Sequence, residues 1–296
     1  MLAKQGGVLA HLQARSAGVP AGRLAVDWVR VGVGAYVPRA AYEELDEAQR
    51  TAATVWAARL GHDTDLVAVG ITAALIHGLP VFGRRPVRPL LVERKPDRPL
   101  HHGRSRTVEE QHVDMVHGVP VTSLCRTAID VARSGGLIRG VVTADAVLAR
   151  DVTRSDLEAV AAACHRWPGI VSARLAVEFA DGRSESPLES IGRVRFHEHD
   201  LVAPDLQVVL HDEDGDMGRV DHYWSATRTV GEADGAVKYS APGDLFAEKL
   251  REDRLRDAGY QVVRYTWDEA VNRPAVVVAR FLRALERGKP GKRSTA

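Results

Sequence analysis

The order of apolar segments in the last third of the chain most constrains its fold. Segments with the apolar spacing of helices are interleaved there with segments that alternate as strands do. A strand that returns after a helical crossover predicts a mixed sheet with helices packed on it. The predicted order is αβββαβα, at residues 187–199, 206–211, 219–224, 228–234, 244–258, 261–267 and 274–286.

Composition indicates a globular α/β protein (of the α+β kind) with two or three domains. The chain has 296 residues, 45% apolar and 27% charged, with a net charge of +1, and a domain takes roughly 100–200 residues. This balance excludes a largely disordered chain and a uniformly basic nucleic-acid coat protein. The longest apolar run, 67–76, is short of the roughly 20 residues that a membrane helix needs.

The lack of a recognisable targeting signal and the small number of cysteines favour a cytoplasmic protein without a membrane partner. The first residues lack the basic start and the long apolar stretch of a signal peptide. Two cysteines, Cys125 and Cys164, are too few for a zinc site of their own or a disulfide framework. We therefore expect a reducing compartment.

The first 42 residues predict a winged-helix domain. Helical segments at 7–14 and 21–28 are followed by two strands around Gly32 and Gly34. Two helices and a hairpin in this order can place the second helix in a DNA major groove and the hairpin on the backbone. We expect a middle α/β domain at 43–180, an endonuclease-like domain at 181–287 and a disordered basic tail at 288–296.

Local signals also predict the elements of the middle domain. Ser123 is expected to cap a helix, and Ser155 with Glu158 matches a capping box. The other predicted elements are helices at 48–60 and 65–76 and strands at 87–92 and 110–116.

Three carboxylates, Asp221, Glu232 and Asp234, form the strongest chemical signal. Glu232 and Asp234 lie two apart on a predicted strand, so they share a face, and pairing with the strand of Asp221 would bring all three together. Oxygen ligands of this kind suit Mg²⁺ or Mn²⁺, which can activate water for attack on a phosphodiester. Two alternatives stay open: the acids lie on a solvent-exposed face, or Asp234-Gly235 forms a hairpin turn.

Two further residues could complete this site. Glu189 could reach the cluster from the preceding helix, although Ser186 and Glu189 also match a capping box with Pro187 at the first helical position. One residue could do both. Lys238 follows the cluster closely and could bind a phosphate or orient the attacking water.

The C-terminal pattern resembles actinobacterial proteins with a domain similar to the very-short-patch-repair endonuclease, of the PD-(D/E)xK superfamily. The resemblance implies an αβββαβ nuclease core, metal binding by Asp221 and Glu232, and an acidic role for Glu189. Asp234 stands where the superfamily usually has its lysine, so Lys238 would have to substitute. The segments that carry the resemblance are Ser184–Ser190, Arg219–Asp221, Gly231–Tyr239 and Glu248–Trp267.

The N-terminal half resembles AbiEi-type antitoxins. The resemblance implies a DNA-binding repressor of an operon that also encodes a nucleotidyltransferase toxin, and hence a possible toxin partner. The matching segments are Gln5–Val8, Gly32–Tyr36, Val69–Pro80 and Val121–Asp130.

Basic residues are the candidates for DNA contact. Residues 1–48 balance their basic and acidic side chains, which is a poor electrostatic footprint for DNA. A proline-interrupted basic patch at 84–106 fits either phosphate contact or an idle solvated loop. The candidates are Arg15, Arg23, Arg30, Arg84, Arg85, Arg88, Arg94 and Lys95.

Three functions follow from these signals. The first is a Mg²⁺- or Mn²⁺-dependent DNA endonuclease. The second is a non-catalytic DNA-binding antitoxin or repressor that keeps the nuclease fold as a scaffold. The third is a protein that neutralises a toxin without touching DNA.

Overall fold

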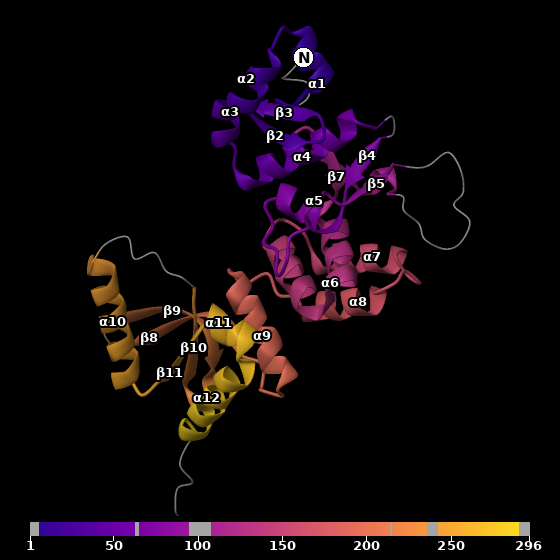
Figure 1. The fold of residues 1–296 in the computed structure, drawn as a ribbon. Coiled ribbons are helices and arrows are strands. Elements are labelled where there is room, and N and C mark those ends of the chain that lie inside the picture. Colours follow the sequence, from indigo (N-terminus) through magenta and orange to yellow (C-terminus); the bar gives the residue numbers. More distant parts are fainter. Residues whose placement is uncertain (1–5, 63–64, 95–107, 214, 236–241, 290–296) are drawn as a thin grey trace, which may run out of the picture. The chain divides into compact units, whose positions relative to one another are not determined.

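The protein has a mixed α/β fold, seen in a computed structural model (Figure 1). The structure describes residues 6–62, 65–94, 108–213, 215–235 and 242–289. Its contacts divide the chain into two compact units, residues 1–179 and 180–296. None of the helices in these described ranges combines the length and apolar character needed to cross a membrane.

Unit 1 begins with two short helices and a three-stranded antiparallel sheet of order β1-β3-β2. The helix predicted at 7–14 starts only at His11, because Leu9 and Ala10 pair as a strand with Tyr36 and Ala35. Trp28 belongs to the hairpin and not to the second helix. The elements are β1 (Leu9–Ala10), α1 (His11–Ser16), α2 (Ala21–Val26), β2 (Trp28–Gly32) and β3 (Ala35–Pro38).

Two glycines shape this hairpin and its packing. Gly34 takes a positive φ of 64° at the turn, where an L side chain would be strained. A Cβ at Gly32 would lie 2.5 Å from the Cβ of Ala57, so only glycine lets β2 lie against α4 (Glu47–Leu60) this closely. The core there joins residues on both sides of position 42: Val8, Ala35, Val37, Ala53 and Ala57.

The rest of unit 1 is a second four-stranded sheet, of order β5-β4-β7-β6, and a group of helices (Figure 1). It contains α3 (Arg39–Glu43), α4, β4 (Leu66–Ala68), α5 (Gly70–Ile76), β5 (Leu91–Glu93), β6 (Val113–Val116), β7 (Val119–Thr122), α6 (Leu124–Leu148), α7 (Arg154–Ala163) and α8 (Ile170–Phe179), with a 3-10 turn at Glu110–His112.

Several local predictions for unit 1 were wrong. The single helix predicted at 65–76 is strand β4 followed by α5, with Gly70 at a φ of 55° between them. The capping box of α7 is Thr153 with Asp156, two residues before the predicted pair. Ser123 occupies the N-cap position of α6, but its side chain makes no capping hydrogen bond.

Unit 2 is a four-stranded sheet of order β11-β10-β9-β8, in which only β10 and β11 run parallel. The element order is the predicted one with one more helix, α11. The bounds are α9 (Pro187–Glu198), β8 (Asp205–Asp212), β9 (Gly215–Trp224), β10 (Thr229–Asp234), α10 (Pro242–Asp257), β11 (Gln261–Thr266), α11 (Trp267–Asn272) and α12 (Pro274–Arg287), with a 3-10 turn at Ser225–Thr227.

Helices cover both faces of this sheet. Figure 1 shows α10 on one face and α9, α11 and α12 on the other. On the α10 face, Leu255 packs with Val230 and Tyr260. On the other face Phe196 packs against an aromatic cluster that includes fully buried His222, whose Nε2 lies 2.8 Å from the Tyr265 hydroxyl. His222 is therefore a core residue.

Candidate functional site

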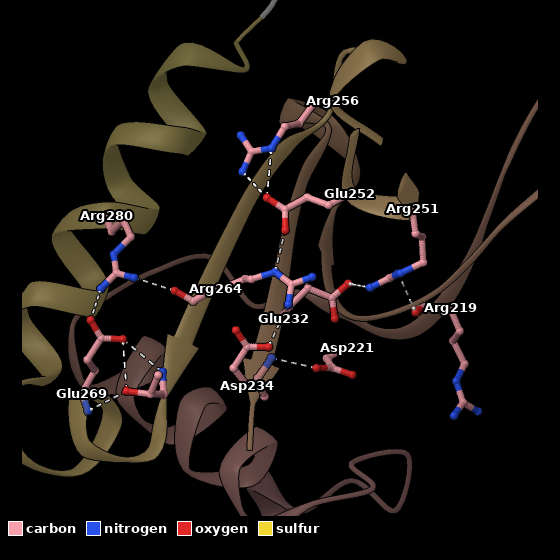
Figure 2. Close-up of polar contacts among 12 residues, drawn as sticks. Arg219, Asp221, Glu232, Asp234, Arg251, Glu252, Arg256, Arg264, Glu269 and Arg280 are labelled. Atoms are coloured by element: carbon pink, nitrogen blue, oxygen red, sulfur yellow. Dashed lines mark hydrogen bonds and ion pairs between the residues drawn. The ribbon is translucent and has the colours of Figure 1, made fainter. Parts of the chain in front are cut away.

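The sheet of unit 2 brings Asp221 and Glu232 together. Strands β9 and β10 are antiparallel, and the next pair beyond Gly231 and His222 in this register is Glu232 and Asp221. The N–H of Ala233 donates to Asp221 Oδ2 at 2.8 Å, so this carboxylate reaches across to the neighbouring strand (Figure 2). Pairing of the two strands thus gives the adjacency of Asp221 and Glu232 that the sequence predicted, whereas Asp234, the third predicted member, is paired with Arg264.

The surroundings of both carboxyl groups raise their pKa values above the ordinary range. Burial raises the pKa of Asp221 to about 6, and the nearby Glu189 also raises it, whereas the Ala233 N–H lowers it. Burial likewise raises the pKa of Glu232 to about 7; Asp221 adds to this rise and Arg251 opposes it. Burial is thus the main reason why both carboxyl groups hold a proton more readily than they would in water.

Gln207 connects Asp221 to Glu189, a link that the sequence did not reveal. The Gln207 Nε2 donates to Glu189 Oε2 at 2.8 Å and lies 3.4 Å from Asp221 Oδ1. Gln207 has a φ of 54° within β8, a left-handed backbone that is uncommon for a residue other than glycine. Nothing in the alternating pattern of this strand signals such a conformation, so its amide could not be placed beforehand.

Glu189 serves both the helix start and the site, although not through the predicted capping box. Its N–H donates to Ser186 Oγ at 3.2 Å, as a capped helix requires. Its carboxylate, however, accepts from the N–H of Glu185 at 2.9 Å and from Gln207. With a side chain that is only 6% exposed, Glu189 joins the first turn of α9 to the carboxylates of the sheet.

Asp234 lies at the end of β10 in an ion pair and not in a hairpin turn. The turn alternative was wrong, because β10 continues through Asp234 and the next strand, β11, pairs parallel to it. Asp234 Oδ1 accepts from an Arg264 Nη1 at 3.0 Å, and Arg264 also pairs with Glu252 at 2.8 Å (Figure 2). Its charge is thus compensated by Arg264 of β11, which it shares with Glu252 of α10.

Arg251 is the cationic group that the fold brings to the carboxylates. It lies on α10 and donates an Nη2 hydrogen bond to Glu232 Oε1 at 2.9 Å (Figure 2). The sequence contained this residue within a charged run of a helix, where the usual interpretation is a solvated face. Only the packing of α10 over β9 and β10 distinguishes it from its exposed neighbours.

The remaining predicted residues fall into four groups. Lys238 and Lys95 lie outside the described residues. Arg23 pairs with Asp27 at 2.7 Å, and Arg94 pairs with Asp65 and Glu110 at 2.8 Å. Arg15 and Arg84 are exposed. Arg30, Arg85 and Arg88, which are distant in sequence, line one groove of unit 1.

The donor set suits a cation at two of the predicted metal-binding positions. Among the described residues, no three His, Cys, Asp or Glu side chains form a ready metal-binding group. Asp221 and Glu232 nonetheless offer adjacent oxygen donors whose raised pKa values a divalent charge would lower. Two protein carboxylates with waters and a substrate phosphate are an ordinary set for Mg²⁺.

Comparisons with known proteins identify relatives in Mycobacterium tuberculosis. Uncharacterized protein MT2308 (strain CDC 1551 / Oshkosh) and Uncharacterized protein Rv2248 (strain ATCC 25618 / H37Rv) are each 34% identical to this chain over 175 residues. The match covers 59% of this chain and 65% of each relative, so it spans just under two thirds of their length. No family model matches the chain, and no solved structure matches it.

Proposed function

We propose that this protein is a DNA endonuclease that hydrolyses phosphodiester bonds with Mg²⁺ or Mn²⁺. The observation that carries the proposal is the adjacency of half-buried Asp221 and buried Glu232 on neighbouring strands, with Asp221 tied through Gln207 to Glu189. Clustered buried carboxylates cost stability, so their presence favours a ligand over a structural role.

Asp221 and Glu232 would hold the divalent cation. Such an ion, when bound, lowers the pKa of a water molecule and stabilises the leaving oxygen of a phosphodiester. Glu189 and Gln207 keep Asp221 in position: the Gln207 amide bridges the two carboxylates, and the Ala233 N–H fixes the second oxygen of Asp221.

Arg251 replaces the cation that the third motif lacks. Asp234 stands at the usual lysine position and is committed to Arg264. Arg251 extends from α10 to Glu232, where its guanidinium can bind a substrate phosphate in two-point geometry. Lys238, the substitute expected from the sequence, stays a prediction.

The arrangement of elements supports both parts of the proposal. The order αβββαβ in unit 2, with one parallel strand pair, fits a restriction-endonuclease-like core. The order β1-α1-α2-β2-β3 in unit 1, with its antiparallel sheet, fits a winged helix and hence a DNA-binding function.

Cleavage of supercoiled plasmid and of single-stranded DNA by the full chain, with Mn²⁺, Mg²⁺ or EDTA, tests the proposal. We expect metal-dependent cleavage that disappears in Glu232→Gln. A matched control is Asp212→Asn, an acid of β8 that pairs with Arg254 in the same unit, and it should cleave normally. Folded wild-type protein that cleaves neither substrate with either metal would overturn the proposal.

A non-catalytic DNA-binding antitoxin or repressor is the second candidate. It is favoured by the arginine partners of Glu232 and Asp234, which supply part of the compensating charge without a metal. This candidate predicts promoter binding that is independent of metal and unchanged in Glu232→Gln. A toxin partner would then be sought by co-expression with the neighbouring gene.

A further inference from the structure

Unit 1 contains a groove that brings two basic segments together. Its volume is about 1140 Å³, and its walls are the β2–β3 hairpin, α4 and the segment before β5. Arg30 belongs to the hairpin, and Arg85 and Arg88 belong to the segment 83–90. An ion pair between Arg85 and Glu47 of α4 ties the far wall to the helix.

The charge of the groove favours an anionic ligand. Four arginines line it, with Glu47 as its acidic residue. Arg50 stacks on Tyr42 and donates to backbone carbonyls, and Arg85 is paired with Glu47. Within the described part of the chain, Arg30 and Arg88 have no acidic partner. These two guanidinium groups are exposed, and each can bind a phosphate oxygen through its Nη atoms, while Arg30 Nε donates to the Gly32 carbonyl.

The same groove is also lined by apolar side chains. Val33 at the hairpin tip is 92% exposed, and Val87 on the opposite wall is fully exposed. Val31, Pro86 and Pro89 continue this surface into the groove. Duplex DNA presents phosphates outward and keeps its base faces stacked inside, so it would leave these walls uncovered. A single strand offers phosphates and unstacked base faces together.

We propose that this groove binds single-stranded nucleic acid, with Arg30 and Arg88 on its phosphates and Val33 and Val87 against its bases. The inference deepens the proposed function and rests on it for the class of ligand. It also moves the contact surface away from α2, the helix that would enter a major groove. The arginine of that helix, Arg23, already pairs with Asp27.

Fluorescence anisotropy of the full chain in EDTA tests this proposal. The probes are a labelled oligothymidylate, a mixed-sequence duplex of the same length, and polyglutamate as a competitor. We expect oligothymidylate to bind at least about tenfold more tightly than the duplex. The double variant Arg30→Ala/Arg88→Ala should lose about tenfold in affinity and reduce the salt slope by about 1.4, which corresponds to two phosphate contacts on a single strand.

Matched variants separate the groove from general surface charge. Arg174→Ala/Arg283→Ala removes the same charge from exposed positions outside the groove lining, and it should bind within about twofold of wild type. Val33→Ser/Val87→Ser should weaken oligothymidylate and leave the duplex unchanged. Thermal melting checks that each variant is folded.

Three results would overturn the proposal: equal or tighter binding of the duplex, equal losses in the two arginine pairs, or equally effective competition by polyglutamate. The last would identify an acidic protein segment as the occupant. The binding assay requires neither metal nor cleavage. Its outcome therefore tests the groove even if the protein is not an endonuclease, and a failure of the groove proposal would leave the cleavage test unaffected.

Discussion

Two ionic clusters, one in each unit, differ in how far arginines of the chain compensate their carboxylates. In unit 1, Asp130 accepts from Arg126 Nε and from an Arg133 Nη1, each at 2.9 Å. Both guanidinium groups also stack on Trp167, at 4.4 and 4.6 Å from the ring centre. One carboxylate is thus held by two cations, and each planar group has a hydrogen-bonding and a stacking partner.

In unit 2 the balance is reversed. Asp221 and Glu232 lie side by side with Glu189 nearby, and Arg251 donates a hydrogen bond to Glu232. Burial raises the pKa of both sheet carboxyls, and their hydrogen-bonding and cationic partners offset only part of this rise. In unit 1 the carboxylate is matched by cations of the chain itself, and we propose that the carboxylates of unit 2 are matched in part by a cationic ligand.

The largest expected effect is on cleavage. Asp221→Asn keeps the size of the side chain and one acceptor oxygen, but it loses the second acceptor and removes a charge that would hold the cation. We expect the cleavage rate to fall by about 10³-fold, which is about 4 kcal/mol. Plasmid nicking under single-turnover conditions measures it, and activity within a few-fold of wild type would remove Asp221 from the site.

A substitution in the cluster of unit 1 should change the stability of the protein and not its cleavage rate. Asp130→Ala leaves Arg126 buried without its carboxylate, so we expect a loss on the order of 3 kcal/mol in the free energy of unfolding. Urea denaturation followed by tryptophan fluorescence measures it. Cleavage by the remaining folded protein should be unchanged, and a loss below about 1 kcal/mol would make the two clusters equivalent.

For Glu232 in the metal-free protein we expect the opposite change in stability: its substitution should stabilise the fold. Its folded pKa of about 7 lies above the ordinary value of 4.5, so folding takes up protons and stability falls as pH rises toward 7. Glu232→Gln should therefore stabilise the protein by on the order of 2 kcal/mol at about pH 8 and have little effect at about pH 5. Thermal melting in EDTA across this range measures the difference. Destabilisation at the higher pH would mean that Glu232 is primarily an ion-pair partner of Arg251.

The smallest effect concerns Gln207. Its amide helps to lower the pKa of Asp221, so Gln207→Ala should shift the acidic limb of the cleavage pH profile to higher pH. The maximal rate should fall by less than about tenfold. A reduced rate with an unmoved profile would indicate a purely structural contribution.

The sequence predicted the order of elements in unit 2 better than the details that complete the site. Antiparallel pairing of two consecutive strands is sufficient to place Asp221 beside Glu232, because strands that follow each other in sequence usually pair. The split at Gly70 was missed because an apolar run buried on all sides does not distinguish strand from helix.

The contacts of Gln207, Asp234 and Arg251 depend on tertiary structure. The left-handed backbone at Gln207 has no residue signature, and Asp234-Gly235 carries the signature of a turn that does not form. Arg251 could not be told from its neighbours in α10, since its partner Glu232 is contributed by a different element. Such cross-element pairing follows from packing rather than from local pattern.

Calorimetric titration of Mn²⁺ into the metal-free full chain near neutral pH tests the central claim most directly. The account predicts one site per chain, with proton release, because Asp221 and Glu232 must ionise fully to bind the cation. Repeating the titration in buffers of different ionisation enthalpy counts the protons. In Asp221→Asn/Glu232→Gln both the binding and the proton release should vanish, while Asp212→Asn retains them. Absence of Mn²⁺ binding by folded wild-type protein, or equal binding by the double variant, would contradict the account.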